Sequence, residues 1–288
     1  MAQGIDLDAS EVSSLLYHDI FDYPLSLGEL MKWRAGEKLT TNNEELTIKS
    51  RNGFYFFKGR DGIVLKRLLR KRVSAKKFEI ARKAGQILSF VPTIKMVAVT
   101  GALAMDNAAE EGDIDLLVVS QKGTLWATRL ITLIFLDLIG FPRRKYGDRN
   151  QKDKLCLNIW LDETSLSWPR NDRNIYSAHE IAQIKLIADK DRTYDRFIQV
   201  NGWVKDFWPN AVKIDRKRGK KQKAGSLTNV SYLFFGLIEP LAFSFQRFYM
   251  RKKITKERVG KKRALFHPVD WWAVLKTKFT SLGLGFKR

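Results

Sequence analysis

Two aspartates separated by one residue, Asp113 and Asp115, are the strongest chemical signal in this sequence. They stand directly before the apolar run Leu116 to Val119, which predicts that they lie at the start of a buried strand. Residues two apart on a strand point to the same face, about 6.6 Å apart along the backbone, so the two carboxylates can converge. Such a pair repels unless a cation neutralises it, and Mg²⁺ prefers carboxylates together with substrate phosphates. We therefore expect a Mg²⁺ or Mn²⁺ site here.

A glycine turn precedes the aspartates. The apolar run Val97 to Val99 predicts another buried strand, and Gly101 follows it at the start of a short helix. Because glycine has no Cβ, backbone N–H groups at such a turn can approach a triphosphate closely. We therefore expect Thr100, Gly101 and Ala102 to bind nucleotide next to the metal.

This stretch resembles the DNA polymerase beta-like nucleotidyltransferases, in which a Gly followed by Gly or Ser precedes Asp-x-Asp or Asp-x-Glu on a strand. Here Gly101 and Ala102 are followed by ten residues and then by Asp113 and Asp115, while Ala102 stands where the family has Gly or Ser. The resemblance covers roughly residues 62–165. It implies transfer of an NMP from an NTP to an acceptor, with Asp113 and Asp115 bridging the metal ions and Gly101 holding the triphosphate.

The third carboxylate of that family lies on a later, adjacent strand, which is predicted here for Leu155 to Asp162. The central polar residue of this segment is Asn158, which we place at the third catalytic position. Asp162 has the same strand parity but lies about 13 Å further along, and Asp153 has the opposite parity. An amide can bind Mg²⁺ but cannot act as a base. Two functions therefore remain open: a nucleotidyltransferase, or a weak or inactive protein of the same fold that binds nucleic acid or acts as an antitoxin-like partner.

Basic residues follow the next predicted helix, at 123–139. Arg143 and Arg144, with Lys145, lie in the connection to the strand at 155, where one or more could hold a phosphate. An ordinary basic loop is the alternative.

A second, weaker pattern lies further along the chain. Arg173 and His179 match the Arg-polar-x-x-x-x-His spacing of HEPN ribonuclease helices, which often partner small nucleotidyltransferases. His179 and Glu180 on an amphipathic helix also fit a packed or capped pair.

Composition and charge limit the partners. The 288 residues, 44% of them hydrophobic, can bury more than one core, so two or three domains are expected. The net charge of +21 indicates a polyanionic partner, either nucleic acid or an anionic membrane surface. From Ala211 onward 20 Lys and Arg stand against 4 Asp and Glu, a net +16. The single cysteine, Cys156, excludes an internal disulfide, and the N-terminus has no signal-peptide pattern, so we expect a cytoplasmic protein.

The flanking segments are predicted from their patterns. Two helices within 8–34 and a type I′ hairpin at Asn52-Gly53 look like a winged helix-turn-helix, which either contacts DNA or serves packing. A long basic helix at 62–90 leads to the predicted core, and residues 173–208 are predicted to be helical.

The C-terminal part begins with a predicted basic linker at 213–226. The apolar segment 232–245 is ranked first as a buried helical hairpin and second as a membrane-surface segment, and the aromatic, basic tail after it can stack bases and neutralise phosphates. Overall we predict an α+β protein. Its parts are a winged-helix-like domain (1–61), a small mixed β-sheet nucleotidyltransferase core with its leading helix (62–165), a helical segment (166–210) and a basic helical C-terminal region (211–288).

Overall fold

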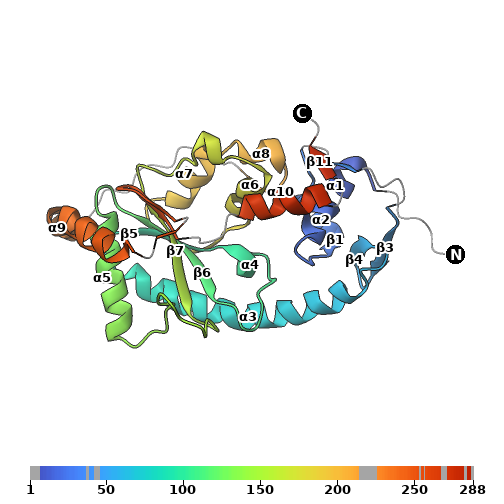
Figure 1. The fold of residues 1–288 in the computed structure, drawn as a ribbon. Coiled ribbons are helices and arrows are strands. Elements are labelled where there is room, and N and C mark those ends of the chain that lie inside the picture. Colours follow the sequence, from blue (N-terminus) through green and yellow to red (C-terminus); the bar gives the residue numbers. More distant parts are fainter. Residues whose placement is uncertain are drawn as a thin grey trace.

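A six-stranded mixed sheet forms the centre of the computed structural model, which describes residues 7–36, 39–41, 46–213, 226–252, 254–255, 257–266, 271–281 and 284–286 (Figure 1). The strand order is β8-β5-β6-β7-β10-β9. The strands are β5 (Ile94–Val99), β6 (Ile114–Ser120), β7 (Leu155–Asp162), β8 (Lys185–Asp189), β9 (Arg258–Val259) and β10 (Arg263–Leu265).

Strand direction changes within the sheet. β5 is antiparallel to both β6 and β8, whereas β6 and β7 are parallel. A parallel pair needs a crossover connection, which α5 (Leu125–Leu138) supplies. Because β6 and β7 point the same way, their first residues lie at the same edge of the sheet. This edge carries the aspartates.

Side chains of the strands alternate between two hydrophobic cores. On β6, Leu117 and Val119 belong to one core, and Leu116 and Val118 belong to the other. This period of two is expected where both faces of a sheet are covered. The buried strands predicted from the apolar runs at 97–99 and 116–119 are confirmed.

Helices cover both faces of the sheet (Figure 1). One core is shared with α3 (Gly62–Ser89), α5 and α9 (Ser226–Met250). The other core is shared with α6 (Ile175–Gln183), α7 (Thr193–Val200), α8 (Val204–Phe207) and α10 (Trp271–Ser281). A short 3-10 turn, Arg170–Asp172, precedes α6. The helices predicted at 62–90 and 123–139 are thus confirmed as α3 and α5.

The N-terminal part consists of α1 (Ala9–Asp19), β1 (Leu25–Ser26), α2 (Leu27–Lys32) and a hairpin of β3 (Ile48–Arg51) with β4 (Phe54–Phe57). Asp8 and Ser26 cap the two helices, each within a capping box. The hairpin turn is the predicted one, since Asn52 and Gly53 have φ angles of +53° and +77°. A further strand, β2 (Leu39–Thr41), pairs with β11 (Leu284–Phe286).

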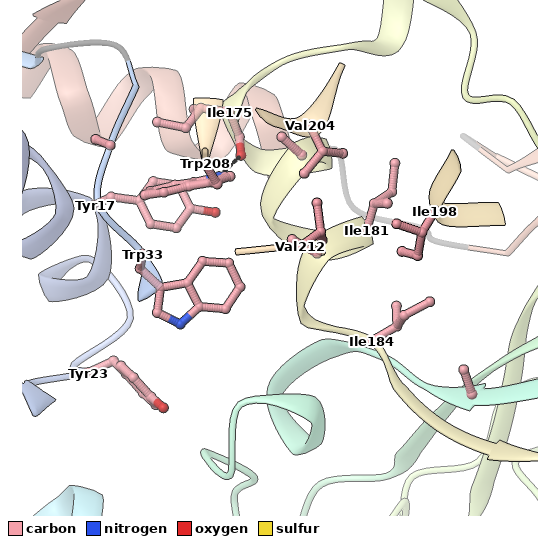
Figure 2. Packing of buried hydrophobic residues seen from close by; sticks show 14 of the residues in the cluster. Tyr17, Tyr23, Trp33, Ile175, Ile181, Ile184, Ile198, Val204, Trp208 and Val212 are labelled. Carbon is pink, nitrogen blue, oxygen red and sulfur yellow. Dashed lines mark hydrogen bonds between the residues drawn. The ribbon is translucent and has the colours of Figure 1, made fainter. Parts of the chain in front are cut away.

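An aromatic cluster joins the N-terminal part to α6 and α8 (Figure 2). Trp33 stacks on His179 with ring centroids 4.1 Å apart, and Tyr17 meets Trp208 at 5.0 Å. The indole N–H of Trp208 donates to the carbonyl of Ile175 at 3.1 Å. The N-terminal helices are therefore packed into the same core as the sheet.

Two predictions of secondary structure are wrong. Residues 173–208 are not helical throughout, because 185–189 form β8. Since β5 is fully buried, the backbone groups on its second edge need a partner, and β8 provides it. The C-terminal region is not wholly helical either, because β10 and β9 extend the sheet beyond β7.

The predicted helical hairpin at 232–245 is also wrong. α9 runs unbroken through Glu239 and Pro240. The Glu239 carboxylate accepts hydrogen bonds from the backbone N–H groups of Trp126 and Ala127 at 3.0 and 2.7 Å, so it holds α9 against the start of α5. The proline costs the helix one hydrogen bond without ending it. Most of the linker predicted at 213–226 lies outside the described residues.

Candidate functional site

Gly101 makes a close turn between β5 and α4 (Gly101–Ala104). Its φ is +61°, in the left-handed region. A Cβ at this position would lie 2.8 Å from Oδ2 of Asp115. The residue therefore has to be glycine for two separate reasons, and its missing side chain lets the Asp115 carboxylate pack against the turn.

The two aspartates converge at the start of β6. Asp113 immediately precedes the strand, and Asp115 is its second residue. One oxygen of each carboxylate and the sulfur of Cys156 all lie within 4.8 Å of one another. The structure thus brings the two acids together.

A buried lysine fixes the turn before Asp113. Lys77, on α3, donates to the carbonyl of Gly112 at 2.7 Å and to Oδ1 of Asp153 at 2.6 Å. Its side chain is only 1% exposed, so the ion pair is shielded from water on the lysine side. At least one cation of the basic helix therefore positions the acidic edge instead of facing solvent.

Asn158 reaches the aspartates because of an irregularity in β7. The register of β6 and β7 shifts between Asp115 and Leu117, so that two residues, Leu157 and Asn158, stand opposite one. A bulge of this kind redirects a side chain. The amide of Asn158 donates to Oδ1 of Asp115 at 2.6 Å, and its own oxygen is buried with no hydrogen-bond partner among the described residues.

Glu180 is a third acid at this site, and it comes from a helix. Its carboxylate is hydrogen-bonded by Gln183, whose side-chain N–H groups reach Oε1 of Glu180 at 2.6 Å and the carbonyl of Gly101 at 3.3 Å. The backbone of Gly101 is a further hydrogen-bond partner of Glu180, and the charge of Asp115 acts on it. The sequence named Glu180 only through a ribonuclease-like spacing, because strand parity says nothing about a residue on α6.

Burial, with a smaller contribution from a neighbouring aspartate, raises the pKa of two of the acids. Burial raises the pKa of Asp115 to about 7, and the neighbouring charge of Asp113 adds to the effect. Burial, followed by the charge of Asp115, raises the pKa of Glu180 to about 8. Burial and both aspartates also raise the pKa of the Cys156 thiol well above its usual value. The site carries more negative charge than its own residues compensate.

The two arginines of the connecting loop have different partners. Arg144 donates to Oδ2 of Asp113 at 2.9 Å and lies at the acidic site. Arg143 instead forms a two-pronged ion pair with Asp137 of α5, with one nitrogen 2.9 Å from Oδ1. Of the two predicted phosphate ligands, the structure therefore brings only Arg144 to the aspartates.

A cavity of about 840 Å³ opens beside the acids. Residues of α5, α9, the basic loop and β7 line it. Arg144 and Asn158, which bond to Asp113 and Asp115, belong to this lining, whereas the two aspartates themselves do not. It is large enough for a small-molecule substrate.

The other nucleotide-binding candidates lie at the same turn. Thr100 is buried, its N–H donates to the carbonyl of Asp115 at 3.0 Å, and its hydroxyl finds no hydrogen-bond partner in the described part of the chain. Ala102 is exposed beside Gly101. Among the described residues, neither side chain forms a hydrogen bond to the carboxylates.

Arg173 and His179 are held by packing contacts. Arg173 donates to the carbonyl of Trp168 at 3.2 Å and lies over the ring of Trp203, at 5.2 Å from its centroid. His179 is buried in the aromatic cluster, where its Nε2 lies 3.1 Å from Nε2 of His18. The ribonuclease-like role of this pair stays a prediction.

The donor set at the acidic edge suits a hard divalent cation. Asp113 and Asp115 offer carboxylate oxygens, and the buried amide oxygen of Asn158 lacks a partner within the described ranges. Oxygen ligands of this kind are those of Mg²⁺ and Mn²⁺. Cys156 is a poor ligand here, because its raised pKa keeps the thiol protonated.

Comparison with known proteins identifies no relative: no family model matches the chain, and neither the curated proteins nor the solved structures contain a match.

Proposed function

We propose that this protein is a Mg²⁺-dependent nucleotidyltransferase that moves an NMP from an NTP to an acceptor. The observation that carries the proposal is the convergence of Asp113, Asp115 and Asn158 at one edge of the sheet, against the Gly101 turn, with the amide oxygen of Asn158 lacking a partner in the part of the chain that the structure describes. Burial and the neighbouring charge of Asp113 raise the pKa of Asp115 to about 7, and a cation bound between the two carboxylates would relieve their repulsion.

The residues divide the work as follows in this proposal. Asp113, Asp115 and the Asn158 oxygen would hold Mg²⁺, which would supply charge neutralisation and activation of the phosphoryl group. Glu180 is the candidate base for the acceptor hydroxyl, because it lies against the Gly101 turn and its pKa of about 8 is close enough to neutral pH for the ionised, proton-accepting form to be populated. Arg144, which donates to Asp113 at the acidic edge, is the candidate contact for a phosphate.

The cavity provides room for a substrate beside the acids. Its lining includes Arg144 and Asn158 together with polar and apolar residues of α5 and α9. We assign it to the acceptor, since the triphosphate is expected at the Gly101 turn.

The test is calorimetric titration of each NTP, with Mg²⁺ and without it, into the wild type and into Asp113→Asn/Asp115→Asn. We expect binding that requires Mg²⁺ and is lost in the variant. The matched control is Glu110→Gln/Glu111→Gln, which removes two exposed acids that share Lys152 and lie next to the site in sequence. Control and wild type should bind alike.

Turnover is tested separately by incubation with cell extract and NTPs labelled at the α or the γ phosphate. Transfer of the α label alone, with the γ label leaving as pyrophosphate, is the expected result. Transfer of the γ label would identify a kinase instead. Absence of Mg²⁺-dependent NTP binding in the wild type would reject the proposal.

A further inference from the structure

α9 exposes a continuous apolar face. Six large side chains on it are between 56% and 78% exposed, namely Leu233, Phe234, Leu237, Leu241, Phe245 and Phe248. At about 100° per residue they fall within about 120° of arc on one side of the helix. We call these six residues the α9 face. Single apolar side chains scattered over a surface need no special explanation, whereas a continuous apolar face of this size does.

The opposite side of α9 is a normal buried surface. Phe235, Ala242 and Met250 enter the core shared with α3 and α5. Gln246 is buried and bonds to Arg129 of α5 and to the carbonyl of Trp126. One side of the helix is therefore packed against the protein, and the α9 face on the other side points outward.

The end of α5 extends the apolar surface. Ile134 and Leu138 are 50% and 80% exposed. Ile134 and Phe245 line the same cavity between the two helices, so the exposed parts of α5 and α9 adjoin. Figure 1 shows both helices at one end of the molecule, away from α1 and α2.

Charge around the α9 face is positive. Arg247, Arg251 and Lys252 are exposed at the C-terminal end of the helix. Glu239 is the one acid in residues 233–252, and its carboxylate turns inward to the start of α5. Lys261 and Lys262 follow in the turn between β9 and β10 and are exposed as well.

We propose that the α9 face lies on an anionic membrane surface, with its apolar side chains in the interfacial layer and the neighbouring cations on lipid phosphates. A helix with Phe and Leu on one face and cations at the edge has the features of an interfacial helix. Within the described ranges, no helix is long and apolar enough to span a bilayer. The α9 face is therefore suited to lie on a membrane surface.

The charge pattern selects this occupant over others. Nucleic acid would meet the six apolar side chains, which offer it no hydrogen-bond donors. A second copy of the chain would bring the same cations against themselves, at a cost in repulsion. Anionic lipid satisfies the apolar and the basic parts at once.

The experiment is flotation of the full chain with vesicles of phosphatidylcholine alone or of phosphatidylcholine mixed with phosphatidylglycerol. We expect binding to the mixed vesicles and little binding to the neutral ones. Leu237→Glu/Leu241→Glu should lower the affinity for mixed vesicles at least about tenfold. Neither residue lines the cavity, and both are exposed, so the variant should melt like the wild type.

The chain offers a matched control. Leu65→Glu/Leu69→Glu on α3 changes the same residue types at the same spacing and adds the same charge, and these leucines are 64% and 52% exposed. The control should keep wild-type affinity. Equal losses in the two variants would mean that only net charge matters, and would overturn the proposal.

The contribution of the cations is measured with Arg251→Gln/Lys252→Gln against Lys71→Gln/Arg72→Gln on α3, all four of which are exposed. Only the first pair should weaken binding to mixed vesicles. Light scattering of the wild type without lipid tests the remaining occupant. A dimer that becomes a monomer in Leu237→Glu/Leu241→Glu would assign the α9 face to a second copy, and the membrane proposal would be abandoned.

Discussion

The side-chain amide of Asn158 donates a 2.6 Å hydrogen bond to the carboxylate of Asp115, while its own oxygen is buried and has no partner in the described part of the chain. The amide thus stabilises the Asp115 carboxylate by a hydrogen bond and keeps an acceptor oxygen that is unpaired within the described ranges. In the function proposed above, this oxygen is the third ligand of the metal.

Asn158→Asp is expected to exchange stability for metal affinity. The substitution replaces a donated hydrogen bond by a third negative charge, so the metal-free protein should lose about 1–3 kcal/mol of unfolding free energy. Mg²⁺ and Mn²⁺ should bind more tightly and restore the melting temperature. Thermal melts over a series of metal concentrations measure both effects, and a variant that melts identically with and without metal would show that residue 158 does not serve the ion.

Gly101→Ala is expected to be destabilising for two additive reasons. The alanine is strained at a φ of +61°, and its Cβ meets Oδ2 of Asp115 at 2.8 Å. We expect a loss of about 2–4 kcal/mol together with weaker metal binding.

Two other glycines separate these reasons. Gly123→Ala has a comparable φ of +69° with no atom within 4 Å of the added Cβ, and should lose only about 1 kcal/mol. Gly28→Ala lies within a helix with open space and should be neutral or stabilising. Urea denaturation of the three variants measures the differences, and equal losses in Gly101→Ala and Gly123→Ala would mean that the Asp115 contact costs nothing.

Asp115 should make the metal-free protein less stable as the pH rises. Its folded pKa of about 7 lies above the ordinary value of 3.8, so the folded state binds the extra proton and its stabilisation is present below pH 4 and lost as the pH rises through 7. Asp115→Asn should remove the part of this slope that Asp115 contributes and gain on the order of 2 kcal/mol at pH 8, while the contribution of Glu180 remains. Chemical denaturation between pH 4 and pH 8 is the measurement, and Mg²⁺ should suppress the same slope in the wild type.

The buried pair of His18 and His179 should act in the opposite direction. Nδ1 of His18 faces the carbonyl of Ser14 at 2.8 Å and must donate, so its Nε2 accepts from His179. Burial lowers the pKa of His18 to about 4 from 6.5, and that of His179 is lowered as well. Both rings fold neutral, and stability present above pH 6.5 is lost as the pH falls toward 4.

His18→Gln/His179→Gln should flatten this acid-side loss while lowering stability at pH 7 by about 1–3 kcal/mol, because the aromatic packing around Trp33 is weakened. The comparison is made in the Asp115→Asn/Glu180→Gln background, which removes the opposing slopes of the two acids whose pKa values are raised to about 7 and 8. If the variant loses unfolding free energy below pH 6.5 as steeply as its background does, protonation of the two histidines does not destabilise the folded state.

Glu180→Gln tests the acid that helix α6 contributes. The amide oxygen can still accept from Gln183, so the fold should be retained. If Glu180 acts as a base, turnover should fall at least about a hundredfold with little change in NTP affinity. Glu79→Gln, which removes an exposed acid paired only with Arg82 in the bonds described, is the control and should leave both unchanged.

Much of the local structure follows from the sequence alone. Asp8 and Ser26 start helices because their side chains accept from the first backbone N–H groups, and Asn52-Gly53 makes a type I′ turn because both residues tolerate positive φ. Apolar runs predicted the buried strands around Asp113 and Asp115 for the same local reason.

Only the tertiary structure decided which distant groups meet these local elements. The bulge at Leu157 and Asn158 depends on pairing with β6, and Glu180 reaches the Gly101 turn because α6 packs across the sheet. Strand β8 forms at 185–189 because β5 has a free edge, although its own residues read as helical. The buried side of α9 is held by the hydrogen bonds that Glu239 accepts at the start of α5. Glu239 and its partner Ala127 are 112 residues apart in the chain. Such contacts join segments that are far apart in the sequence, and the local pattern of apolar residues does not predict them. They determine where the acids, the cavity and the α9 face lie.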